Sequence, residues 1–273
     1  MRKIALVLEY EGAEYAGFQK QANARSVQEV LEEAVYSLTG SWLRVKGAGR
    51  TDAGVHAAGQ VVAFETDSGH SPETFRDGLN HHLPKDIAVA AAYEVPVDFD
   101  PRRHATSRVY RYTILISKAR SALRRRFVHL ERRRLNLAAM TQALGYLEGK
   151  RDFAPFSGRL KAGQGTVRML YRTVVWRERD EVYLEVEGSS FLPQQVRRMA
   201  GAVLQVGLEK MTLEEFTLLA NQGRQGASHW VLPSAGLCLR EVKYQEFLPQ
   251  SHARTTDDPT HSSDRFEAQM ARH

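Results

Sequence analysis

The chain has 273 residues and a formal net charge of +6, with 42% hydrophobic and 26% charged residues, a composition that excludes a disordered or collagen-like protein. A single cysteine, Cys238, excludes an intramolecular disulfide and a multi-cysteine zinc site and is typical of a reducing compartment. Because the sequence shows neither a leader pattern nor an apolar run of about 18 residues, we expect a cytoplasmic protein without a membrane span.

The first hundred residues predict the order strand, helix, two strands, helix, strand. The capping box Ser26-Val-Gln-Glu29, followed by apolar residues at helical spacing, predicts a helix that ends at Gly40. Ser71-Pro72 supplies the N-cap and first residue of a second helix. Alternating or continuous apolar patterns predict strands at 3–9, 42–47, 60–66 and 86–95.

The second half repeats this order without residue-level repeats. Residues 106–117 alternate, with Tyr110 and Tyr112 on one side of the predicted strand. A second capping box at Thr212 begins the last predicted helix. The other expected elements are a helix at 135–147, a hairpin of 166–177 and 182–187, a helix at 194–208 and a last strand at 236–247.

These elements predict an α+β fold of two similar, RRM- or ferredoxin-like halves that form one mainly antiparallel sheet, with helices on one side and an active-site cleft between the halves. We expect an N-terminal half at 1–104 and a C-terminal half at 105–248. Residues 249–273 have too few apolar side chains to form a core, so we expect a flexible polar tail.

A strongly basic segment lies near the start of the second half. Residues 102–134 hold twelve Lys or Arg and a single acid, Glu131. A solvated basic face is one interpretation. We favour a polyanionic partner, nucleic acid above all, because phosphates relieve the repulsion within such a segment.

Several familiar sites are missing from the sequence. Residues 145–151 resemble a phosphate-binding loop but have the wrong glycine spacing, and Gly163-Gln-Gly165 lacks the third glycine of a dinucleotide fingerprint. The histidines show no metal-ligand spacing. The sequence therefore predicts neither a metal nor a cofactor.

The most informative segment is Gly49-Arg50-Thr51-Asp52-Ala53-Gly54-Val55-His56. One interpretation is a tight turn in which Asp52 caps its own backbone and Gly54 supplies a positive φ. The alternative is a catalytic carboxylate, which the neighbouring cation Arg50 would keep ionised by lowering its pKa.

This segment resembles the signature of the tRNA pseudouridine synthase A (TruA) family, whose catalytic aspartate falls on Asp52. The resemblance covers about residues 4 to 247. The other residues that carry it are Tyr10, Gly12, Tyr15, Gly17, Gln19, Gln21, Ser26-Val-Gln28, Asn80, Leu83-Pro84, Phe99, Arg102, Ala105, Arg108, Tyr110, Tyr112, Gly149, Asp152-Phe153, Phe156, Gly188, Phe191-Leu192, Val196-Arg197, Met199, Gly201, Pro233, Gly236-Leu237, Leu239, Val242 and Tyr244. The chain departs from the family pattern at Phe18, Arg151 and Pro193-Gln194-Gln195.

The resemblance implies an isomerase that converts uridine to pseudouridine at positions 38, 39 and 40 of the tRNA anticodon stem-loop, without cofactor or metal, as a homodimer. It implies that Asp52 is the nucleophile, that Tyr110 stacks on the extruded uracil and that Arg197 pairs with Asp52. Arg50 would hold the place or the phosphate of that nucleotide. The further substrate-binding residues that we expect are Arg102, Arg108, Arg124, Arg125 and Arg126.

Two alternatives remain open at this point. A non-catalytic RNA-binding module would use the same halves and basic segment. A carboxylate glycosidase or base-excising enzyme would also place an aspartate beside an anomeric carbon, but it would release free uracil.

Overall fold

The computed structural model describes residues 1–221 and 224–245; the expected tail at 249–273 and the expected end of the last strand at 247 lie outside them. The strands are β1 (Arg2–Tyr10), β2 (Lys46–Gly47), β3 (His56–Thr66), β4 (Ile87–Val95), β5 (Ala105–Ile116), β6 (His129–Glu131), β7 (Gly149–Asp152), β8 (Val167–Glu178), β9 (Glu181–Gly188) and β10 (Leu237–Tyr244). The α-helices are α1 (Val27–Thr39), α2 (Pro72–His82), α3 (Leu137–Gly145), α4 (Gln195–Gly207) and α5 (Leu213–Asn221).

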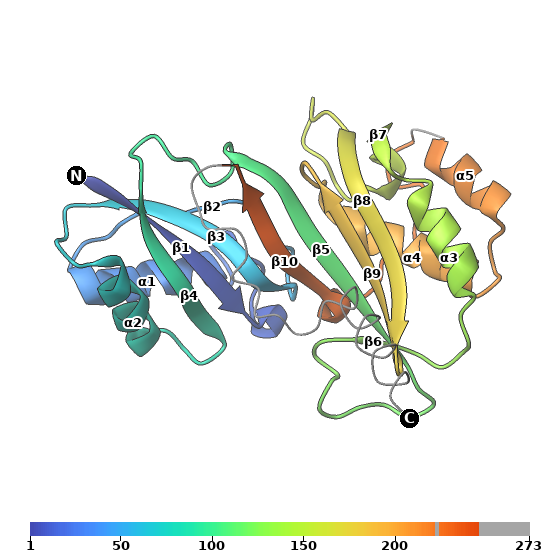
Figure 1. Ribbon diagram of the computed structural model, residues 1–273, viewed down its shortest axis with the longest axis horizontal. Helices are drawn as coiled ribbons and strands as arrows, with labels where there is room; N and C mark the ends of the chain where they lie inside the picture. Colours follow the sequence, from blue (N-terminus) through green and yellow to red (C-terminus); the bar gives the residue numbers. More distant parts are fainter. Residues whose placement is uncertain (222–223, 246–273) are drawn as a thin grey trace, which may run out of the picture.

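The strands form one sheet in the order β4-β1-β3-β10-β5-β9-β8-β7, with β2 paired to β3 and β6 paired to β5 (Figure 1). Among the described residues the parallel pairs are β3–β10 and β5–β6, and the other pairs are antiparallel. The predicted α+β class with a mainly antiparallel sheet is confirmed. The last strand, β10, joins the two ends of the sheet because it lies between β3 and β5.

The five predicted helices are present, although α3 and α4 are shorter than the expected 135–147 and 194–208 by one or two residues at each end. The Ser26 hydroxyl accepts a hydrogen bond from the Glu29 amide at the start of α1, and Gly40 ends the helix with a φ of 72°. At α5 the reciprocal capping box is complete, since the Thr212 amide donates to Glu215 at 2.8 Å and the Glu215 amide donates to Thr212 at 3.1 Å.

The predicted strand at 42–47 is wrong over most of its length, because only Lys46–Gly47 pair with β3. The reason is local: the Val45 amide donates to the Glu32 carboxylate at 3.1 Å and not to a neighbouring strand. The short strands β6 and β7 were not expected. The sequence of β7, Gly-Lys-Arg-Asp, lacks the apolar alternation on which a strand prediction depends.

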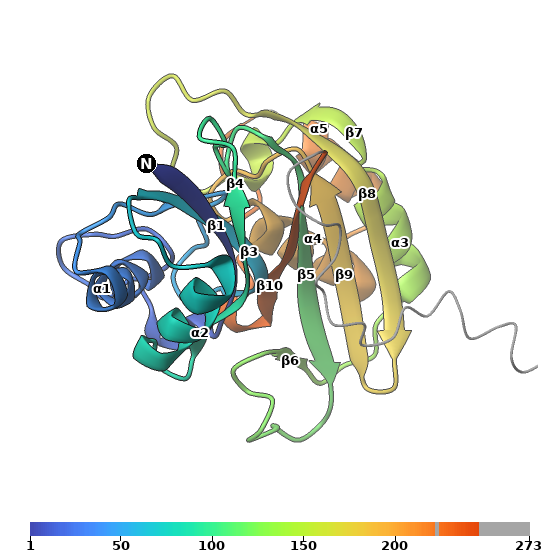
Figure 2. The same ribbon diagram turned by 60° about the vertical axis from the view of Figure 1, so that its left-hand side comes forward.

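The buried residues form one continuous cluster that runs through both ends of the sheet, from Leu6 on β1 through Leu239 on β10 to Leu184 on β9. Figures 1 and 2 show α1 and α2 beside the β4–β1–β3 end and α3, α4 and α5 beside the β9–β8–β7 end. The loop that carries Asp52 precedes β3 and therefore lies next to the junction at β10.

Candidate active site

The loop at residues 48–55 is anchored from several elements. The Tyr10 hydroxyl on β1 lies 2.9 Å from the Thr51 hydroxyl, and the Gln60 amide group on β3 donates to the Gly49 carbonyl at 2.9 Å. The Arg108 guanidinium on β5 donates to the Ala48 carbonyl at 2.9 Å. The loop that carries Asp52 is therefore held by β1 and β3 on one side of β10 and by β5 on the other.

Two glycines allow a second chain segment to pack against this loop. A Cβ on Gly12 would lie 2.0 Å from the Val55 carbonyl oxygen, and one on Gly17, whose φ is +98°, would lie 2.7 Å from the Thr51 carbonyl oxygen. The Phe18 amide donates to that same Thr51 carbonyl at 3.1 Å. The N-terminal motif of the sequence thus acts as the support of the Asp52 loop.

We expect Gly12→Ala to destabilise the protein by about 1–3 kcal/mol, because backbone atoms, which cannot rotate away, occupy the place of the added methyl group. Thermal unfolding of the full chain measures this loss. Gly49→Ala, in the loop against which Gly12 packs, is the control, since a Cβ there meets no atom within 4 Å. Equal Tm values for the two variants would contradict the proposed packing.

The Asp52 carboxylate is partly buried and has two partners on the far side of the pocket. The Gln194 backbone amide donates to Oδ2 at 3.2 Å, and Arg197 Nη1 lies 4.0 Å from the same oxygen. Burial raises the pKa of Asp52 above its usual value, while Arg197 and the Gln194 amide oppose that rise. Arg50 is exposed and is not among the groups that shift the pKa of Asp52. The cation that lowers this pKa is therefore Arg197 and not, as predicted, Arg50.

Arg197 is held by the start of α4. Its Nε donates to the Leu232 carbonyl at 2.7 Å, which fixes the guanidinium. The N-cap of α4, Gln194, adopts a left-handed conformation with φ of 58°, and the Gln195 side chain accepts from the Leu192 amide at 2.8 Å. The segment that departs from the family pattern thus supplies a backbone amide to Asp52 at the positive end of a helix.

Tyr110 lies on β5 with its side chain 8% exposed and its ring edge-to-face with Phe191, at a centroid distance of 5.1 Å. Burial raises its pKa, and the nearby Asp52 adds to that rise, so the phenol keeps its proton near neutral pH. The side chains of Asp52 and Tyr110 line one pocket of about 680 Å³. The structure therefore brings the three predicted catalytic residues together.

Cationic side chains surround this pocket. Seven of them make neither a salt bridge nor a side-chain hydrogen bond with any described residue; the acids in the lining are Asp52 and Asp100, and Lys46 and Arg103 lower the pKa of Asp100. These cations are Arg44, Lys46, Arg50, Arg102, Arg103, Arg159 and Lys161. The composition of the sequence did not reveal Arg44, Lys46, Arg159 and Lys161, because they come from two separate segments that only the fold brings together.

Arg108 lies in the pocket wall but is only 7% exposed. Its guanidinium donates its hydrogen bonds to backbone carbonyl oxygens. The acceptors are the carbonyls of Ala48, Ala105, Arg102 and Ser189. In this structure Arg108 holds the Asp52 loop against β5. Its predicted contact with the substrate stays a prediction.

The three arginines at 124–126 do not line the pocket. Arg124 pairs with Asp180 at 2.7 Å and with Glu181 at 3.0 Å. Arg126 pairs with Glu11 at 2.7 Å and with Glu14 at 3.0 Å, and Arg125 is bonded to a backbone carbonyl of its own loop. Acids from distant segments thus balance much of this charge.

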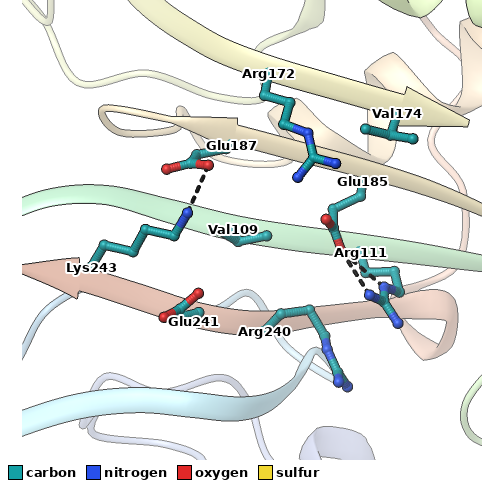
Figure 3. A pocket seen from close by; sticks show the side chains of 9 residues that line it. All are labelled: Val109, Arg111, Arg172, Val174, Glu185, Glu187, Arg240, Glu241 and Lys243. Atoms are coloured by element: carbon teal, nitrogen blue, oxygen red, sulfur yellow. Dashed lines mark hydrogen bonds and ion pairs between the residues drawn. The ribbon is translucent and has the colours of Figure 1, made fainter. Parts of the chain in front are cut away.

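A second hollow, of about 210 Å³, is lined by Val109 and Arg111 of β5 (Figure 3). Because successive residues of a strand face opposite sides of the sheet, this hollow lies on the face opposite to Tyr110. Its charges are largely paired, since Arg111 contacts Glu185 at 2.8 Å and Lys243 contacts Glu187 at 2.9 Å. No group of three or more His, Cys, Asp or Glu within residues 1–221 and 224–245 could hold a metal ion. In the same ranges no helix is long and apolar enough to cross a bilayer.

A partly buried carboxylate in a cation-lined pocket is the arrangement expected of an enzyme that uses a carboxylate on a polyanionic substrate. The comparisons identify it further. The profile of a family described as tRNA pseudouridine synthase matches residues 6–102 and 143–245. The chain belongs to the tRNA pseudouridine synthase family, which confirms the resemblance found in the sequence.

Two similar proteins carry the name tRNA pseudouridine synthase A. The relative from Geobacter sp. strain M21 is 43% identical over 247 residues, which is 90% of this chain and 100% of that protein. The relative from Citrifermentans bemidjiense is 44% identical over 247 residues, which is 90% of this chain and 99% of that protein. A solved H/ACA RNP bound to a substrate RNA matches 75% of this chain and 44% of its own at 12% identity, with a TM-score of 0.39, a similarity too weak to bear on function.

Proposed function

We propose that this chain isomerises uridine to pseudouridine at positions 38, 39 and 40 of the tRNA anticodon stem-loop, with Asp52 as the nucleophile. Family membership makes it an intramolecular isomerase that modifies tRNA. The observation that carries the roles of the residues is the partly buried Asp52 carboxylate, which lies 4.0 Å from Arg197 and lines a pocket whose exposed cations make no salt bridge with the described residues.

The reaction breaks the bond between ribose and uracil N1, turns the base and rejoins the two through C5. The Asp52 carboxylate attacks the ribose or the base, and Arg197 and the Gln194 amide keep it ionised and oriented. Tyr110 offers a rigid aromatic surface to the uracil and, in its protonated form, a proton donor.

The target uridine has to leave its stack before Asp52 can reach it. Extruding a base costs a few kcal/mol, which contacts between phosphates and the pocket cations offset. Arg50 and Arg102 would make such contacts, since each lines the pocket and neither has a side-chain partner among the described residues. Recognition of RNA would thus depend on backbone and shape.

Two similar ferredoxin-like halves are supported by the strand order. The N-terminal half runs β1-α1-β2-β3-α2-β4 and pairs as β4-β1-β3-β2; the C-terminal half pairs its four main strands as β10-β5-β9-β8, which is the same order. We infer halves at 1–104 and 105–248, helices on one face and a catalytic cleft between the halves. We further propose that the protein is a cytoplasmic homodimer. Its native mass in solution tests the dimer.

Isomerisation of an anticodon stem-loop RNA that carries C5-tritiated uridine tests this function. Attachment of the ribose to C5 displaces the tritium into water and keeps the base on the RNA. Release of free uracil would identify a base-excising enzyme. RNA binding without either product would identify a binding module.

The role of Arg124, Arg125 and Arg126 is a separate prediction. Replacing all three with Gln is expected to weaken binding of the stem-loop. The slope of log Kd against log salt concentration should fall by about one to two. The full effect of three charges is not expected, because Arg124 and Arg126 are already paired with acids. Arg102→Gln, at a pocket cation without such a partner, is the comparison, and an unchanged slope in the triple variant would remove the segment from the interface.

A further inference from the structure

The segment between α1 and β2 presents alternate side chains to solvent. Trp42, Arg44 and Lys46 are exposed, while Leu43 and Val45 pack against the core. In extended backbone, alternate residues lie on one face. Because Arg44 and Lys46 line the catalytic pocket, this face leads from the pocket rim to Trp42.

At the end of this face two aromatic rings are stacked in solvent. Trp42 and Tyr36 of α1 have ring centroids 4.6 Å apart and an interplanar angle of 15°. Their residues are 64% and 42% exposed. Since each ring restrains the other, a flat aromatic surface is preformed without being covered by described residues.

The charges around the pair favour a polyanion. Arg44 has no salt bridge or side-chain hydrogen bond within the described part of the chain. Of the acids of α1, Glu32 is buried and accepts hydrogen bonds from the Val45 amide and from Gln28, while Glu33, three residues before Tyr36, is exposed. Cations beside an exposed aromatic surface are the combination that binds unpaired nucleic acid, because bases stack on the ring and phosphates meet the charges.

We propose that Trp42 and Tyr36 form a stacking site for an unpaired base of the RNA substrate, outside the catalytic pocket. Arg44 and Lys46 contact the phosphates between that base and the target uridine. This subsite rests on the proposed function and extends it, because a stem-loop supplies unpaired bases near the modified one. Trp42 lies four residues before Lys46, so the chain between them spans at most about 13 Å.

Binding of an anticodon stem-loop RNA to Trp42→Ala tests the subsite. Kd is expected to rise about 5- to 100-fold, the range measured for stacking of one base on an aromatic ring, and KM to rise with little change in kcat. Trp42→Phe keeps a ring and should recover most of the affinity. Trp176→Ala is the matched control, since Trp176 stacks on Tyr183 at 4.9 Å beneath Arg111 but lies on β8, whereas Trp42 is next in the chain to the segment that lines the catalytic pocket.

Wild-type affinity and KM in Trp42→Ala would overturn the subsite, as would equal losses in Trp42→Ala and Trp176→Ala. In either case continued tritium release by the wild type would leave the proposed function standing. A change in native mass with unchanged RNA affinity would assign the rings to a subunit contact and also overturn the inference. If Trp42→Ala does not fold, a chain with Trp176→Phe and Trp230→Phe reports on Trp42 alone, and unchanged emission on RNA binding would contradict stacking.

Discussion

Asp52→Asn is expected to lower the turnover of tRNA uridine by at least about 10⁴-fold, the scale seen when a nucleophile is removed from an otherwise intact site. The amide has nearly the shape of the carboxylate and can still accept a hydrogen bond from the Gln194 amide. RNA affinity should therefore stay within a few-fold of wild type. Tritium release and RNA binding, measured on the same preparation, separate loss of chemistry from loss of binding.

The same variant should fold at least as well as wild type. Burial raises the pKa of Asp52, so the folded state binds its proton more tightly than the unfolded chain does, and the ionised carboxylate costs stability as pH rises above the unfolded value. Asn removes that cost at neutral pH. A Tm clearly below that of wild type would mean that lost activity reflects misfolding, whereas full turnover in Asp52→Asn would end the catalytic assignment.

Arg197→Met is expected to lower turnover by about 10²- to 10³-fold while RNA binding is largely kept, the range found when a charge-stabilising group is removed from a site. The Met side chain fills a similar volume but leaves Asp52 without the cation at 4.0 Å. Arg197→Lys retains a charge and should recover part of the activity. Wild-type turnover in Arg197→Met would contradict the ion pair.

The pH profile distinguishes this role from a purely structural one. Activity needs the ionised carboxylate, so kcat/KM should rise with pH through the pKa of Asp52. Arg197 opposes the rise in that pKa caused by burial, and its removal should move the acid limb of the profile to higher pH. A lower kcat with an unmoved limb would show that Arg197 supports the helix without acting on Asp52.

The predictable parts of this fold are those set by neighbouring residues. Ser26 with Glu29 and Thr212 with Glu215 act within one helical turn, so their spacing alone marked the starts of α1 and α5. The pairing of Arg197 with Asp52 joins residues far apart in the chain, and no periodicity reveals it. Only the resemblance to the family predicted that pair.

Charge patterns were informative but incomplete. The basic segment correctly indicated a polyanionic partner, yet Arg124 and Arg126 face Asp180 and Glu11, which lie in distant parts of the sequence. Conversely, Arg44 and Arg159 stand in unremarkable segments and meet at the pocket only in the folded chain. A local count of charges cannot show which of them stay unpaired.

A crystal structure of Asp52→Asn bound to an anticodon stem-loop RNA is the most direct test of where the chemistry occurs. We expect one uridine to be turned out of the RNA, with its base against Tyr110 and its ribose or base in contact with residue 52. RNA bound elsewhere on the surface, with every uridine still stacked and the pocket beside Arg197 unoccupied, would contradict the account.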